Sequence, residues 1–122
     1  MRVKGIVWLG TRTERFDEMR EFFLGITGVT PRDEPGMAAF DLASGDRIEV
    51  LDTAVGESYM VAPVAGLLVD DVATARAELE SSGIEFIGPI HTGAGSTWSH
   101  FRAPDGHVYE LSELPGHPAY AT

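Results

Sequence analysis

The sequence predicts an α+β fold in which one unit, a strand followed by a helix and three further strands, occurs twice. Hydrophobic periodicity gives the same order of elements in both halves of the 122-residue chain. When the halves are superimposed, the apolar face of the first predicted helix aligns with that of the second. With one change of spacing, Phe40 then aligns with Phe101 and Glu49 with Glu110. A longer loop in the second half accounts for this change, and such an ordered repeat indicates duplication of one structural unit.

The first half begins with a run of β-branched and aromatic residues, which is typical of a strand. Phe16 and Phe23 then share one helical face, and Thr13 is positioned to cap the helix. Gly25 and Gly28 are expected to end it. The expected elements are a strand at residues 3–10, a helix that follows Thr13, a weak edge strand from Val29, and strands at residues 37–43 and 47–52.

The second half repeats this order after a polar connector. Asp70 and Asp71 are placed to start the second helix, and Gly83 is placed to stop it. The expected strands are at residues 62–69, 84–90, 97–103 and 107–112. We expect a single domain over residues 1–122, with module one at about 3–52, a connector at 53–61, module two at about 62–114 and a frayed tail at 115–122.

The charge balance and the absence of cysteine limit which molecules this protein can bind. There are 9 Lys and Arg residues against 19 Asp and Glu residues, so the net charge is −10. Such a surface repels nucleic-acid phosphates and anionic membranes, and it attracts cationic ligands. The absence of cysteine excludes disulfides and thiolate metal ligands. The longest apolar stretch, at 60–69, is too short to span a bilayer as a helix. We therefore expect a soluble protein, with the cytoplasm as its default location.

Three segments carry a family resemblance. Residues 101–111 contain an aromatic residue, a Pro-Asp-Gly turn and a strand with Glu-Leu, residues 47–50 repeat that strand, and Phe22-Phe23 is an aromatic pair late in the first helix. In this order the chain resembles the vicinal oxygen chelate superfamily, which includes glyoxalases, bleomycin resistance proteins and extradiol dioxygenases. The resemblance covers about residues 3–114. It implies two βαβββ modules whose mixed sheet forms a cup-shaped half-barrel around a ligand cavity, and it implies a homodimer.

The resemblance also implies where a metal would bind. Metal-using members place His, Glu or Gln on the first strand of each module and Glu on the last. Glu49 and Glu110 match the last-strand positions, whereas Trp8 and Val64 occupy the first-strand positions and cannot ligate a metal. Half of the usual site is therefore missing. No cofactor is expected, although a divalent metal on Glu49 and Glu110 stays open as an alternative.

Strand alternation extends the candidate site. If Glu110 faces the cavity, the neighbouring strand presents Trp98, His100 and Arg102 to it and Phe101 to the opposite side. The candidate ligand-binding residues are Trp8, Glu49, Trp98, His100, Arg102 and Glu110, and the candidate catalytic residues are Glu110 and His100. Simpler alternatives stay open: each glutamate pairs with an arginine such as Arg47 or Arg102, His100 is structural, and Trp8 fills the core. His91 is assigned to the surface.

The sequence supports three functional hypotheses. The first is a small-molecule-binding protein that sequesters a planar or cationic compound, because Trp8 and Trp98 offer stacking surfaces and the glutamates offer negative charge. The second is a metal-dependent lyase, isomerase or dioxygenase of the glyoxalase type that uses Glu49 and Glu110. The third is a metal-free enzyme that uses Glu110 or His100 for acid–base chemistry.

Overall fold

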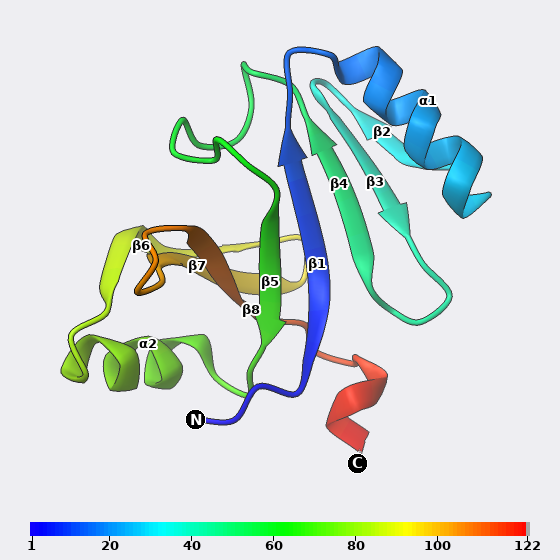
Figure 1. Cartoon of the computed structure of the whole chain (residues 1–122). Helices are drawn as coiled ribbons and strands as arrows, with labels where there is room; N and C mark the ends of the chain where they lie inside the picture. The colour runs from blue at the N-terminus through cyan, green and yellow to red at the C-terminus, as the bar shows by residue number, and fades with distance from the viewer. Residues whose placement is uncertain (122) are drawn as a thin grey trace. The chain divides into compact units, whose positions relative to one another are not determined.

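The structure is a computed structural model that describes residues 1–121. In this part of the chain it contains eight strands, two α helices and one short 3-10 helix (Figure 1). The elements are β1 (Gly5–Arg12), α1 (Phe16–Thr27), β2 (Arg32–Glu34), β3 (Met37–Asp41), β4 (Arg47–Leu51), β5 (Val64–Leu68), α2 (Val72–Ser81), β6 (Glu85–Gly93), β7 (Ser96–Arg102), β8 (Val108–Glu113) and η1 (Pro118–Ala121). The order β-α-β-β-β therefore occurs twice, which confirms the predicted α+β fold. Neither α helix of the described residues is long and apolar enough to cross a membrane.

The chain divides into two compact units, of which one is Trp8–Val64. Its strands follow the order β2-β3-β4-β1. β1 is parallel to β4, and the other pairs are antiparallel. The helix α1 packs on these strands through Phe23, which contacts a cluster that contains Phe40 and Val50 (Figure 1). β2 is an exposed edge strand of three residues, as the proline-broken sequence predicts.

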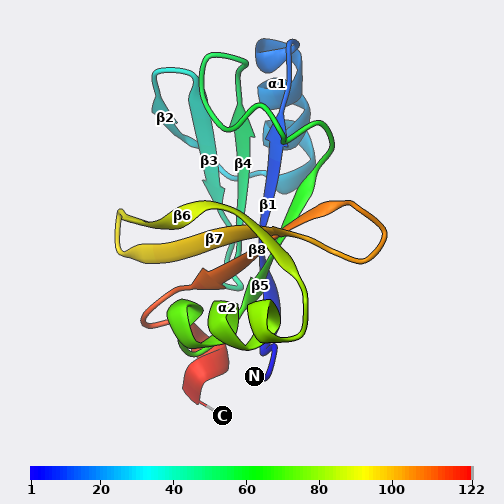
Figure 2. The ribbon, with the colours of Figure 1, turned by 90° about the vertical axis from the view of Figure 1, so that its left-hand side faces the viewer.

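The other unit contains residues 1–7 and the chain from residue 65 onward. Its strands follow the order β5-β8-β7-β6, with β5 parallel to β8 and antiparallel pairs elsewhere. The helix α2 packs on them through Val72 and Ala75, which contact Phe101 and Leu111 (Figure 2). The β6–β7 hairpin forms the long paired ribbon in Figure 2.

The registers confirm that the two modules are equivalent. Gly10 is the partner of Glu49 in the β1–β4 pair, and Gly66 is the partner of Glu110 in the β5–β8 pair. When the two halves of the sequence are superimposed, Gly10 aligns with Gly66 and Glu49 aligns with Glu110. Each glutamate thus occupies the same position of its module.

Two sequence predictions about the ends of the first helix are wrong. The N-cap of α1 is Arg15, which makes no side-chain capping hydrogen bond, and Thr13 instead accepts a hydrogen bond of 3.0 Å from the Arg15 N–H. Gly25 lies inside α1. The helix ends at Gly28, where a φ of 68° suits glycine and the N–H donates to the Leu24 carbonyl. The Asp71 cap of α2 is confirmed, since its side chain accepts from the Thr74 N–H at 2.9 Å.

The connector at 53–61 is held by an arginine of β1. Arg12 donates through Nη2 to the Thr53 carbonyl at 2.7 Å and through Nε to the Val55 carbonyl at 3.2 Å. Met60, near the end of the connector, is buried. The connector is therefore held against β1 within the unit Trp8–Val64, although its sequence is polar.

The prediction of a frayed tail is wrong for residues 115–121, while Thr122 lies outside the described residues. Pro118–Ala121 forms the helix η1. The Tyr120 hydroxyl donates to the Val69 carbonyl at 2.6 Å and accepts from the Leu114 N–H at 3.4 Å. One aromatic anchor that satisfies two backbone groups is enough to order a short terminal segment.

Replacing Tyr120 with phenylalanine is expected to lower the free energy of unfolding by about 1 kcal/mol, because both hydrogen bonds are lost while the ring stays. Burial raises the pKa of Tyr120. A raised pKa means that the stabilisation is complete below the ordinary tyrosine pKa and is lost as the pH rises through the raised value. Urea unfolding at neutral and alkaline pH measures both effects. A difference between the two proteins that does not shrink at alkaline pH would contradict the anchor.

Candidate functional site

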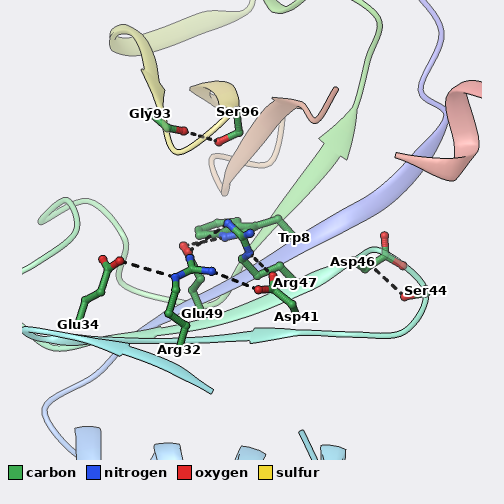
Figure 3. A network of polar contacts seen from close by, with 10 residues as sticks. All are labelled: Trp8, Arg32, Glu34, Asp41, Ser44, Asp46, Arg47, Glu49, Gly93 and Ser96. Atoms are coloured by element: carbon green, nitrogen blue, oxygen red, sulfur yellow. Dashed lines mark hydrogen bonds and ion pairs between the residues drawn. The ribbon is translucent and has the colours of Figure 1, made fainter. Parts of the chain in front are cut away.

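Trp8 lies along its own strand because the residue two positions later has no side chain. Alternate residues of a strand share a face, so Trp8 and Gly10 point to the same side of β1. A Cβ atom on Gly10 would stand 1.9 Å from Cη2 and 2.4 Å from Cζ2 of the Trp8 ring. The indole thus fills the space that a side chain at residue 10 would take. Its Nε1–H donates a hydrogen bond of 2.9 Å to Oε1 of Glu49 on β4 (Figure 3).

A row of charged side chains continues from Glu49 across β4, β3 and β2 (Figure 3). Arg47 Nη1 is 3.9 Å from Glu49 Oε2, whereas Arg47 Nε donates to Asp41 Oδ1 at 2.6 Å. Arg32 Nη1 donates to Asp41 Oδ2 at 3.2 Å, and Arg32 Nε is 3.6 Å from Glu34 Oε1. Glu49 and Arg47 therefore do form an ion pair, but it is a long one of 3.9 Å. The indole nitrogen lies closer to Glu49, at 2.9 Å.

Glu110 and His100 form a buried pair in the other unit. They are register partners on β8 and β7, and His100 Nε2 lies 2.9 Å from Glu110 Oε2. The Ser112 hydroxyl donates to Glu110 Oε1 at 2.7 Å. The side chains of His100 and Glu110 are only 5% and 8% exposed. Since burial removes water from the carboxylate, these two contacts replace its hydration.

The faces of β7 and β8 confirm the predicted alternation. Ser99 Oγ accepts from Arg76 of α2 at 3.2 Å, and Phe101 packs in the cluster that contains α2. These two residues therefore face the helix, and the intervening residues face the opposite side. That side holds Trp98 opposite Ser112, His100 opposite Glu110 and Arg102 opposite Val108.

Two other charged or titratable residues of this unit, Arg102 and His91, differ from expectation. Arg102 donates through Nη1 to the Gly106 carbonyl at 3.1 Å, so the alternative in which Arg102 pairs with Glu110 is wrong. His91 is not an isolated surface residue: it pairs with Trp98 in the β6–β7 register. The two rings stack with centroids 5.5 Å apart and planes 20° apart. Because β6 continues past Pro89 to Gly93, His91 comes to lie within the strand.

The family model described as Glyoxalase/Bleomycin resistance protein/Dioxygenase superfamily matches residues 5–111. The chain belongs to this superfamily. The match covers both modules and both glutamates. Among curated proteins, none matches the sequence.

Solved structures of the superfamily fold are similar over most of the chain. The Mn(II)-bound glyoxalase from Novosphingobium aromaticivorans has a TM-score of 0.71 and 22% identity, and the match covers 92% of this chain and 39% of that one. Methylmalonyl-CoA epimerase from Mycobacterium tuberculosis has a TM-score of 0.70 and 19% identity, with coverage of 98% and 92%. A variant of the Streptomyces coelicolor methylmalonyl-CoA epimerase in complex with 2-nitronate-propionyl-CoA has a TM-score of 0.70 and 15% identity, with coverage of 94% and 100%. These likenesses show the fold.

The residues at the superfamily's metal positions do not fit a divalent metal in this chain. Trp8 carries an N–H donor, and Val64 is a buried hydrocarbon. Nowhere in residues 1–121 do three or more His, Cys, Asp or Glu side chains come together in a group that could hold an ion. Glu49 and Glu110 instead accept hydrogen bonds from their neighbours. A carboxylate with one imidazole at hydrogen-bonding distance is a poor ligand set for a transition metal.

Sequence reasoning placed the glutamates on the correct strands and missed what contacts them. It did not identify Gly10, although a tryptophan followed two residues later by glycine in a strand is a readable signal for a ring that lies along the backbone. It did not identify the Ser112 hydroxyl, two residues after Glu110 on β8, as a donor to this carboxylate.

Proposed function

We propose that this protein binds a small planar organic ligand and that the indole of Trp8 provides the stacking surface. The observation that carries the proposal is the ring held over Gly10. One face of the ring lies against β1, and the side chain is still partly exposed. A flat aromatic ring that is already fixed loses little entropy when a planar ligand stacks on it.

A second indole supports the same type of ligand. Trp98 also lies along the sheet: a Cβ atom on Gly93 would stand 3.6 Å from its Cη2, and His91 is stacked on it. Trp98 therefore has a fixed orientation as well.

The homodimer, the cytoplasmic location and the single domain expected from the sequence stay predictions.

A metal-free acid–base enzyme is the second candidate, and the buried contact between His100 and Glu110 favours it. The carboxylate and the imidazole are 2.9 Å apart with Ser112 as a further donor to the carboxylate. Such an array can hold and move a proton between Glu110 Oε2 and His100 Nε2. Both of these contacts join residues of one unit, and the acid–base chemistry would involve Glu110 and His100 together.

Thermal-shift measurements with planar and non-planar compounds of similar size test the proposed function. Quinoline is expected to raise the melting temperature of the wild-type protein, and decahydro-2-naphthol, a neutral and non-planar bicyclic compound, is not. Trp8→Leu is expected to abolish the shift, while Phe22→Leu, which removes an exposed ring from α1, is expected to leave it unchanged. No shift with quinoline, or an equal shift in Trp8→Leu, would contradict the role of Trp8.

A further inference from the structure

The hydrogen bond between Trp8 and Glu49 changes the electrostatics of the proposed stacking surface. The acceptor is a carboxylate 2.9 Å from the indole nitrogen, and the Glu49 side chain is 15% exposed. A charged acceptor polarises the N–H group more strongly than water does, particularly where water is partly excluded. The polarisation raises the electron density of the ring. An electron-rich ring face attracts positive charge.

The row of charged side chains that contains Glu49 is itself net negative. The row formed by Arg32, Glu34, Asp41, Arg47 and Glu49 holds two positive and three negative groups, a net charge of 2 − 3 = −1. Asp41 lies closer to Arg47 than Glu49 does, at 2.6 Å against 3.9 Å. Asp41 is therefore the nearer partner of Arg47, and Glu49 lies nearer to the indole, at 2.9 Å, than to Arg47.

We propose that Glu49 is a specificity-determining residue that acts through Trp8 to select cationic planar ligands, such as a fused aromatic ring with a delocalised positive charge. The inference rests on the proposed function, since it needs a ligand that stacks on Trp8. Glu49 positions the ring and sets its charge, and the indole makes the contact. A neutral ring binds the same surface more weakly, and an anionic ring is disfavoured.

The net charge of the whole chain, −10, attracts cations to every part of the surface, and this general effect must be separated from the local one. Glu14 offers a matched control. It is an exposed glutamate just before α1, so Glu14→Gln removes the same charge as Glu49→Gln. A general effect responds equally to the two substitutions. The local effect responds only to the substitution at residue 49.

Calorimetric titration with three bicyclic probes tests the inference: 1-methylquinolinium, a cation; quinoline, in a buffer where it is neutral; and quinoline-2-carboxylate, an anion. The wild-type protein and Glu14→Gln are expected to prefer the cation to quinoline by about fivefold to tenfold. Glu49→Gln keeps a hydrogen-bond acceptor without the charge, so it is expected to bind quinoline normally and to lose most of the preference. Glu49→Leu removes the acceptor and is expected to weaken binding of both the cation and quinoline.

The shift of the indole N–H resonance in 15N-labelled protein provides a readout that a merely structural role does not give. The Trp8 resonance is expected to move little in Glu14→Gln, more in Glu49→Gln and most in Glu49→Leu. Equal affinity of the wild-type protein for the cation and for quinoline would overturn the inference and leave the proposed function standing. An equal loss of preference in Glu14→Gln and Glu49→Gln would overturn it as well. If none of the three probes binds, the proposed function fails, and the inference fails with it.

Discussion

Replacing His100 with leucine is expected to lower the free energy of unfolding by about 3–5 kcal/mol. The substitution removes the imidazole that lies 2.9 Å from Glu110 Oε2, and it leaves a carboxylate that is 8% exposed with only the Ser112 hydroxyl as its side-chain donor in that array. A buried charge without its partner costs far more than the contact itself contributes. Denaturant unfolding monitored by circular dichroism measures the loss.

The double variant His100→Leu with Glu110→Leu separates the two causes of that loss. Because it removes the charge together with its partner, it is expected to be more stable than His100→Leu alone. Glu110→Gln serves as the mild control, since an amide oxygen can still accept a hydrogen bond. A double variant that is less stable than the single one would show that packing at this position, and not the buried charge, determines the cost.

The sequence was sufficient to place both glutamates because their position depends on a repeated local pattern. Glu49 and Glu110 each occur on the last strand of a module and stand opposite a glycine of the first strand. Alternation on β7 likewise followed from Phe101, since one core residue determines the face of each neighbour along a strand. These features need only the period of a strand and the order of the elements.

The partners of the two glutamates could not be predicted, because they differ between equivalent positions. Glu49 accepts from an indole that is distant in sequence, on a parallel strand whose register no short turn determines. Val64 occupies the position equivalent to Trp8 and carries no donor, and the partners of Glu110 are instead His100 on β7 and Ser112 on β8. The repeat predicts that the backbones match. It carries no information on which side chain compensates each carboxylate.

Substitution of Gly10 by alanine is expected to weaken quinoline binding by at least about tenfold and to lower the free energy of unfolding by about 1–3 kcal/mol. The added Cβ atom would stand 1.9 Å from the Trp8 ring, so the indole must leave its place over β1 and lose its hydrogen bond to Glu49. Gly10 is needed for space and not for backbone conformation, since it is not among the glycines with positive φ. Gly5→Ala on the same strand is the matched control, because its Cβ atom would meet Val7 at an ordinary 3.7 Å.

A Trp8→Leu background gives the decisive comparison for Gly10. With the indole absent, Gly10→Ala no longer meets a ring, and the destabilisation is expected to fall below about 0.5 kcal/mol. Such strong coupling arises only if the indole occupies the space over Gly10 in solution. Equal costs of Gly10→Ala with and without Trp8 would mean that the ring lies elsewhere, and the stacking surface on which both the ligand and its charge preference depend would then be absent.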